Sequence, residues 1–221
     1  YAVIENTITG VSRRVQTNPL TNYSVLVADQ NLPNNSVVSI INTNVTRFGE
    51  DYNANTTGVF FSLRDKSQNY VVGGRGTIAN QYFQSGTNTG HTYALSAAKI
   101  GGNWRGELFY VEESDDYNPN DLGILFSPNE RQFRGEISYN DFKPKNDKIQ
   151  RWELAISPSY ARLYKPNEFV NFGVSANGFL LWKSRNAIGF NARIEPVSSY
   201  DYFEPRTADF SRFYNFPTSW L

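Results

Sequence analysis

Apolar and polar residues alternate with a period of two along much of the chain. In the clearest stretch, 131–140, Phe133, Ile137 and Tyr139 alternate with polar and charged residues. Successive side chains of a β-strand point to opposite faces of its sheet, so the pattern predicts strands with one apolar and one polar face. No stretch of ten residues shows the spacing of an amphipathic helix. Further strands of the same kind are predicted at 151–160, 170–182 and 188–195.

Less regular alternation predicts more strands in the first half of the chain. They are expected at 22–30, 36–45, 57–64, 69–80, 92–99, 104–112 and 121–127. Residues 1–21 are polar and are expected to form a weak strand followed by a loop. No linker divides the chain, so 1–221 is interpreted as a single all-β, antiparallel segment of about 10–12 strands with no internal domain boundary.

The predicted links between these strands alternate in length. Tight turns at one end and long loops at the other are typical of an up-and-down transmembrane β-barrel, whereas a Greek-key sandwich gives no reason for alternation. One link, Lys183–Arg185, is short where a long one is due. The short links are Asn31–Asn35, Asp65–Gln68, Gly101–Asn103 and Pro128–Glu130; the long ones, expected at one end of a barrel, are Thr46–Thr56, Gln81–His91, Glu113–Asn120 and Asp141–Ile149.

Composition agrees with strands that have one apolar face. Aromatic residues make up 15% of the chain, although hydrophobic residues total only 39%. An outer-membrane barrel with aromatic girdles has this character, and so does a soluble sandwich or propeller. The chain has no run of eighteen apolar residues that would form a transmembrane helix, but barrel strands need only about ten alternating residues.

Charge and residue types exclude several classes of function. Lys plus Arg and Asp plus Glu both number 21, so no basic field exists to hold nucleic acid. The absence of Cys excludes a thiolate metal site or a Cys nucleophile. The one histidine, His91, is expected in a polar link, and no spacing selects a carboxylate pair for glycoside hydrolysis. We therefore expect no enzymatic activity and no cofactor.

A repeated Arg-x-Glu motif lies on the polar side of the predicted strands. A spacing of two places both charges on the same face of a strand, which in a barrel lines the lumen. Opposite charges on adjacent strands can pair laterally, each pair contributing a few tenths to about 1 kcal/mol. Two interpretations stay open: a structural ladder that fills a narrow barrel, and a polar pathway for a solute. The residues of this charge ladder are Arg105, Glu107, Arg134, Glu136, Arg151, Glu153, Arg193 and Glu195.

One acidic stretch resembles a calcium-binding loop in part. Asp116, Asn118 and Asn120 occupy alternate positions, as oxygen ligands of such loops do. Pro119 interrupts the pattern, and the twelfth position is Ser127 rather than Glu. We expect a solvated loop rather than a metal site.

The order of several short motifs resembles one bacterial family. It comprises large outer-membrane proteins, typical of Bacteroidota, with a module similar to family 9 carbohydrate-binding modules followed by a β-barrel domain of unknown function. The resemblance implies contact with the lipid bilayer of the outer membrane and an internal position for this chain, with the module before Tyr1 and more strands after Leu221. It supplies no catalytic residues. The motifs are Asn18–Tyr23, Asn35–Ser36, Ile41–Arg47, Asp51–Asn55, Asn120–Gly123 and Tyr200–Arg206.

The expected function is that of an outer-membrane β-barrel that passes or binds a solute at the cell surface. The module implied upstream makes a saccharide one candidate solute. A first alternative is a structural or assembly component of the outer membrane whose lumen is plugged by its own charges. A second alternative is a soluble β-sandwich or propeller that binds a ligand.

Overall fold

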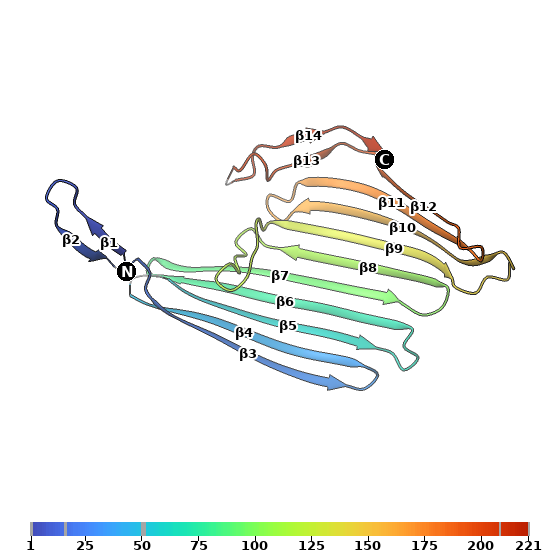
Figure 1. The fold of residues 1–221 in the computed structure, drawn as a ribbon, viewed down its shortest axis with the longest axis horizontal. Coiled ribbons are helices and arrows are strands. Elements are labelled where there is room, and N and C mark those ends of the chain that lie inside the picture. The colour runs from blue at the N-terminus through green and yellow to red at the C-terminus, as the bar shows by residue number, and fades with distance from the viewer. Residues whose placement is uncertain (1, 16, 50–51, 208, 221) are drawn as a thin grey trace.

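The chain folds into one large antiparallel β-sheet. A computed structural model describes residues 2–15, 17–49, 52–207 and 209–220. Across the sheet, eleven strands formed by these residues are hydrogen-bonded side by side in the order β15-β12-β11-β10-β9-β8-β7-β6-β5-β4-β3 (Figure 1). The sheet is not closed, because β3 and β15 are its edges. The predicted all-β, antiparallel class is confirmed, and from β3 to β12 each strand pairs with the next one along the chain. Among the described residues no helix is long and apolar enough to cross a membrane.

Ten long strands make up most of the sheet, and short strands lie at both ends of the chain. A hairpin of β1 (Ala2–Glu5) and β2 (Ser12–Val15) replaces the single weak strand and loop expected in 1–21. β13 (Ser199–Asp201) pairs with β14 (Tyr214–Phe216), and β15 (Ser219–Trp220) with β12. The long strands are β3 (Leu20–Leu32), β4 (Ser36–Phe48), β5 (Asn53–Arg64), β6 (Tyr70–Phe83), β7 (Gly86–Lys99), β8 (Trp104–Glu113), β9 (Glu130–Asp141), β10 (Ile149–Leu163), β11 (Phe169–Trp182) and β12 (Ala187–Glu195).

The strand predicted at 121–127 is absent. Residues 114–129 instead form one loop between β8 and β9. Within it, the Asn120 side chain accepts a hydrogen bond from Leu125 N (2.5 Å) and donates one to Leu125 O (3.0 Å). The Asn120 amide therefore takes the place of a neighbouring strand, which explains why alternating apolar residues here do not form one.

The missing strand changes which end of the sheet each later link occupies. The links 49–52, 84–85 and 114–129 lie at one end, which we call the loop end, whereas 142–148 lies at the other, the turn end. The prediction that all four long links share one end is therefore wrong for 141–149.

Two further predictions about the links change as well. The expected links 46–56 and 81–91 are mostly strand, because backbone pairing continues through their Asn- and Thr-rich residues; residues 50 and 51 lie outside the described part, as do Tyr1 and Leu221. With the correct number of strands, Lys183–Arg185 joins the short turns at the turn end and is no exception.

Strand register divides the sheet into an apolar face and a polar face. Trp152, Leu154 and Ile156 of β10 share the apolar face, because their register partners lie on the same side of the sheet. Alternation along 170–182 and 188–195 predicts that Val170, Phe172, Val174, Ile188 and Phe190 lie on the same face. All of them do except Val170, which lies at a β-bulge where the register between β10 and β11 shifts.

Two rows of aromatic side chains border the apolar face. At the turn end, the Tyr139 ring lies 5.0 Å from that of Trp104 and 4.8 Å from that of Trp152, between ring centroids. Toward the loop end, the Tyr110 ring lies 5.7 Å from that of Tyr93 and 4.5 Å from that of Phe133. The side chains between the two rows include Leu95, Leu108, Ile137, Leu154 and Ile156.

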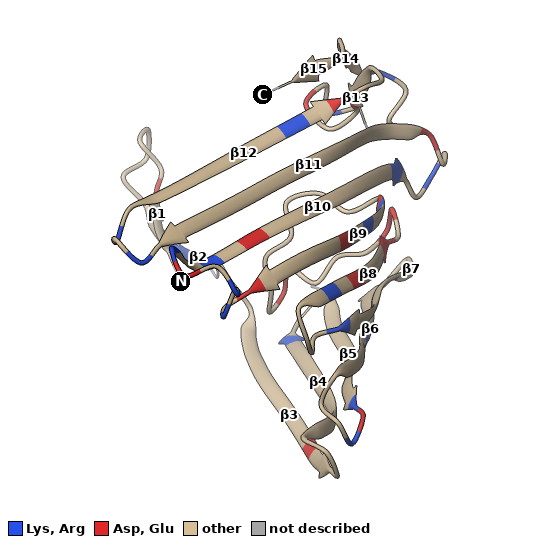
Figure 2. Ribbon diagram, turned by 90° about the vertical axis from the view of Figure 1, so that its right-hand side faces the viewer, with Lys and Arg blue, Asp and Glu red and all other residues tan. Residues whose placement is uncertain are grey.

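No second layer covers the apolar face among the described residues. Contacts between strands run between sheet neighbours, within the two hairpins, and from β13 to β11. Leu108 on the apolar face is 71% exposed, whereas Ser138 and Ala155 on the polar face are buried. This difference indicates that the sheet curves toward its polar face, and Figure 2 shows the curvature from β12 through β8 to β3.

Candidate functional site

The charge ladder lies on the polar face of β8, β9, β10 and β12. The register places Arg105 and Glu107 on the same side as Arg134 and Glu136. Arg151 and Glu153 of β10 point to that side, and so do Arg193 and Glu195 of β12. Eight charged side chains therefore share one surface.

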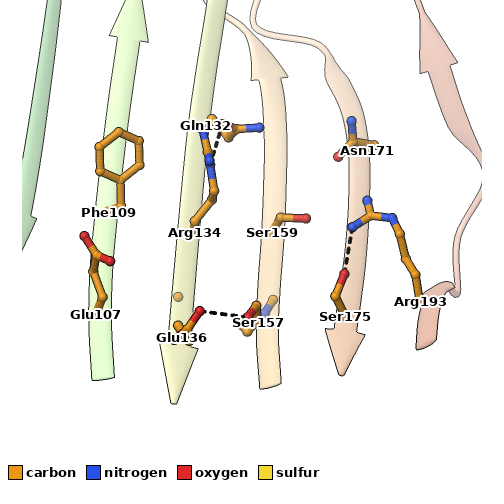
Figure 3. Close-up of a pocket in the computed structure, with 12 residues that line it drawn as sticks. Glu107, Phe109, Gln132, Arg134, Glu136, Ser157, Ser159, Asn171, Ser175 and Arg193 are labelled. Atoms are coloured by element: carbon orange, nitrogen blue, oxygen red, sulfur yellow. Dashed lines mark hydrogen bonds between the residues drawn. The ribbon is translucent and has the colours of Figure 1, made fainter. Parts of the chain in front are cut away.

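A transverse row of polar side chains crosses these strands at one height. Glu107 lies opposite Glu136, and Ser175 lies opposite Ser157 and Arg193. Ser157 Oγ donates to Glu136 Oε2 (3.3 Å), and Arg193 Nη1 donates to Ser175 Oγ (3.2 Å), as Figure 3 shows. Neighbouring strands are about 4.8 Å apart, so about 14 Å separates the β9 and β12 positions of this row. The row is negative on β8 and β9 and positive on β12.

The transverse row lines a hollow of about 740 Å³ on the polar face. Arg134 lies over the Phe109 ring, with its guanidinium carbon 5.1 Å from the centroid, and Arg134 Nε donates to Gln132 Oε1 (2.7 Å). Ser159 and Asn171 add further hydrogen-bonding groups to the lining (Figure 3). Donors and acceptors of both charges around one aromatic ring can hold a polar solute in a defined orientation.

The ladder's ion pairs run along the strands rather than between them. Arg193 pairs with Glu195 (3.0 Å), and Arg151 with Glu153 (3.4 Å). Glu107 lies opposite the like-charged Glu136. Lateral pairing, expected from spacing alone, needs a register that aligns opposite charges. The observed register instead sets Arg193 opposite Ser175, Glu153 opposite Asn140 and Arg134 opposite Phe109.

The loop 114–129, which we call the inward loop, lies against the polar face at the loop end (Figure 1). Its Asp121 carboxylate contacts Arg47 Nη2 of β4 at 2.5 Å. The Tyr52 hydroxyl and Gln81 Nε2 also donate to this carboxylate, at 3.0 and 3.3 Å. The side chains of Arg47 and Asp121 are 14% and 7% exposed, so this is a largely buried ion pair between segments 74 residues apart.

Gly90 on β7 lets the inward loop approach the sheet. A Cβ added at Gly90 would lie 2.2 Å from the Tyr117 Cα. Tyr117 is buried there, and this burial raises the pKa of its phenol. A glycine is required at this position for steric reasons, because any side chain would occupy the space of the loop backbone.

Gly90→Ala is therefore expected to displace the inward loop. Overpacking of this kind costs about 1–3 kcal/mol, and the loop should become more sensitive to protease. The matched control is Gly76→Ala on β6, whose added Cβ would lie 3.8 Å from Val59 Cγ2, an ordinary contact. Limited proteolysis and thermal unfolding measure both effects. Equal protease resistance in the two variants would contradict this account of Gly90.

The candidate metal loop is held by internal hydrogen bonds. Asn118 Oδ1 accepts from Asn120 N (3.1 Å), and Asn118 Nδ2 donates to Gln81 Oε1 (3.4 Å). The Asn120 side-chain amide is hydrogen-bonded to the backbone of Leu125, and Asp116 is exposed. Within the part of the chain that the structure describes, no three His, Asp or Glu side chains are grouped to hold a metal ion.

His91 lies on β7 and not in a link as expected. Its Nε2 is 3.4 Å from Glu112 Oε1, on the apolar face just beyond the aromatic row at the loop end. Glu112 also accepts from the Tyr110 hydroxyl (2.7 Å) and from Arg131 Nε (2.5 Å). Its carboxylate is thus surrounded by partners on neighbouring strands, an arrangement that joins β7, β8 and β9 at this end.

Sequence reasoning missed the residues that hold the inward loop. Asp121 is one of several acidic residues in its stretch, and Arg47 stands out only as part of a family motif. Gly90 was not singled out, because the candidate chemistry at this position was that of the next residue, His91. The pairing of Arg47 with Asp121 leaves no local signal, because it joins distant segments.

Comparison with known proteins identifies the family. No curated protein and no solved structure is significantly similar to the chain. The family model described as "Domain of unknown function (DUF5916)" matches residues 1–220. An open, antiparallel all-β sheet with one apolar and one charged face is thus the structure of an uncharacterised domain, and the chain belongs to the DUF5916 family.

Proposed function

We propose that this chain forms part of the wall of an outer-membrane β-barrel, in which the polar face lines a passage for polar solutes. The proposal rests on one observation: an uncovered apolar face bordered by two aromatic rows. Membrane barrels have an outward apolar band flanked by aromatic girdles at both interfaces. The location in the outer membrane of a Gram-negative bacterium, of the Bacteroidota type, is part of the same proposal.

The height of the apolar band supports the proposal. On β10 it extends from Trp152 to Tyr160, eight residues apart, which at about 3.4 Å per residue is about 27 Å along the strand. A strand tilted by about 40° projects this length to roughly 21 Å, comparable with the apolar band of about 25 Å in membrane barrels. Polar and charged side chains, including Arg162 and Asn80, follow on the same face beyond the band.

The soluble alternative has less support. A sandwich packs a second sheet about 10 Å from the first and buries its apolar face between them. Here the apolar face of β5 to β12 stays uncovered by described residues, and large exposed apolar patches mark contact with a membrane or a partner. In a membrane the open edges at β3 and β15 would need to pair with strands outside these residues, because a bilayer tolerates only closed barrels.

The transverse row suggests which solutes use the passage. Its carboxylates and guanidinium, with serines between them, offer a dipolar surface, and the equal numbers of positive and negative residues argue against strong ion selectivity. We therefore propose a polar, uncharged or dipolar solute, for which a saccharide is one candidate. The alternative of a structural barrel with a plugged lumen is favoured by one observation, the inward loop on the polar face.

Membrane fractionation and solute uptake test the proposal. The full-length protein that contains these residues, expressed in a Gram-negative host, is expected in the outer membrane after a carbonate wash and to migrate faster on gels before heating. Proteoliposomes containing it should swell in oligosaccharide solutions faster than empty ones. Release by carbonate as a monodisperse soluble protein would support the soluble alternative. Stable insertion without oligosaccharide uptake would support the structural component.

A further inference from the structure

We infer that the inward loop, residues 114–129, narrows the barrel's passage and sets its effective width. The inference rests on the proposed function, because a passage exists only if the sheet is part of a barrel. It goes beyond that function by naming the segment that determines which solutes pass. Three features of the loop support it: its path, its attachment and the chemistry of its exposed part.

The path of the loop runs across the polar face rather than away from the sheet. It leaves β8, passes Gly90 of β7 and Gln81 of β6, and reaches Arg47 of β4. Four strand spacings separate β8 from β4, about 19 Å. The loop returns to β9 from there, so the residues after Asp121 span the same strands a second time.

The loop is attached at both its middle and its base. In the middle of the loop, Asp121 accepts hydrogen bonds from Arg47 of β4, Gln81 of β6 and Tyr52 in the link before β5. At the base, Asn129 is fully buried; its Nδ2 donates to Lys165 O and its Oδ1 accepts from Lys165 N, both at 2.8 Å. Lys165 Nζ also lies 3.2 Å from the Asp115 carboxylate. Attachment at two places keeps the loop on the polar face, where a loop held only at its ends would extend into solvent.

The returning part of the loop exposes apolar side chains. Ile124 is 83% exposed and Phe126 98% exposed, and the two lie between the attachments at Asp121 and Asn129. The loop contacts the sheet through Tyr117, Asn118 and Asp121, whereas Ile124 and Phe126 are almost fully exposed and so do not pack against it. In a barrel we place these two apolar side chains in the passage. An apolar constriction resists the entry of hydrated ions and leaves permeation to solutes small enough to pass.

Cysteine labelling tests the position of the loop. Residues 1–221 contain no Cys, so Ile124→Cys adds one thiol to this segment, at an exposed position. In planar bilayers, a bulky methanethiosulfonate reagent, which forms a disulfide with the thiol and releases sulfinate, is expected to lower the conductance at least two-fold. Dithiothreitol should restore it. Ser184→Cys, in the exposed link at the turn end, is the control, and its labelling should leave the conductance unchanged.

Loosening the loop provides the second test. Asp121→Asn removes the charge that holds Arg47, and is expected to raise conductance and uptake of larger oligosaccharides at least two-fold. Asp147→Asn, the same change at an exposed position of the turn end, is the matched control and should match wild type. If Asp121→Asn fails to fold, the cysteine experiment decides alone.

The outcomes separate this inference from the proposed function. Complete labelling of Ile124→Cys, verified by mass spectrometry, with unchanged conductance overturns the inference and leaves the barrel intact. The inference is supported if the wild-type protein inserts without conducting and the Asp121→Asn variant conducts. It is overturned if both proteins insert and neither conducts. A chain that never enters membranes removes the proposed function, and the inference with it.

Discussion

Replacing Ile156 by arginine is expected to destabilise the membrane-embedded protein by about 2–4 kcal/mol, the cost of an arginine at the lipid-facing midplane of a barrel. Ile156 lies midway between Trp152 and Tyr160 on the apolar face of β10. In the proposed barrel it contacts lipid chains, which cannot hydrate the guanidinium. On the surface of a soluble protein the same change, at a residue 44% exposed, would stay within about 0.5 kcal/mol.

The adjacent residue supplies the matched control for this prediction. Ser157→Arg places the same side chain on the polar face of the same strand, one residue away, beside the Glu136 carboxylate. We expect a change of less than about 1 kcal/mol, typical of an accessible ion pair. Guanidinium titration of both variants folded into lipid vesicles measures the difference. Equal and small effects would argue strongly against a lipid-facing apolar surface.

Removing the Asp121 carboxylate is expected to cost about 3–5 kcal/mol of the free energy of unfolding. Asp121→Ala removes one carboxylate that accepts hydrogen bonds from Arg47 Nη2, the Tyr52 hydroxyl and Gln81 Nε2, in a place where Arg47 and Asp121 are largely buried. Arg47 Nη1 still donates to Tyr52 O (2.9 Å), which favours the lower end of the range. The loss combines the buried ion pair with the two further hydrogen bonds that the Asp121 carboxylate accepts.

A double-mutant cycle and a second ion pair check this explanation. Arg47→Ala combined with Asp121→Ala should cost clearly less than the sum of the single changes, because the buried charge is then gone. Asp115→Ala removes the partner of Lys165, whose side chain is 70% exposed, and should cost no more than about 1 kcal/mol. Denaturant unfolding in detergent measures all four variants. Similar losses for Asp115→Ala and Asp121→Ala would show that the inward loop is not held as described.

The strands and their faces could be predicted from sequence because alternation is a local property. Trp152 and Glu153 are consecutive residues of β10, so they lie on opposite sides of the sheet whatever strands pair with it. The same reasoning was wrong at 121–127, where Leu122, Ile124 and Phe126 alternate like strand residues. There the Asn120 side chain bonds the Leu125 backbone, so no neighbouring strand is paired.

Tertiary structure alone decided how charges and loops are arranged. Arg-x-Glu spacing places both charges on one face, but the register between strands sets Glu107 beside Glu136 and Arg193 beside Ser175. Because the strand predicted at 121–127 is absent, the link 142–148 lies at the opposite end of the sheet from the one expected, since each strand reverses the direction of the chain.

The inward loop shows the same division between local and distant information. The sequence by itself determined that residues 114–120 are a polar loop; the contact of Asp121 with Arg47, 74 residues away, decided that this loop lies on the polar face. Such a contact forms only after the intervening strands have paired and brought β4 under the loop. Sequence patterns do not predict such a contact. Local spacing specifies which side of a strand a residue occupies, but not which distant segment will lie against that side.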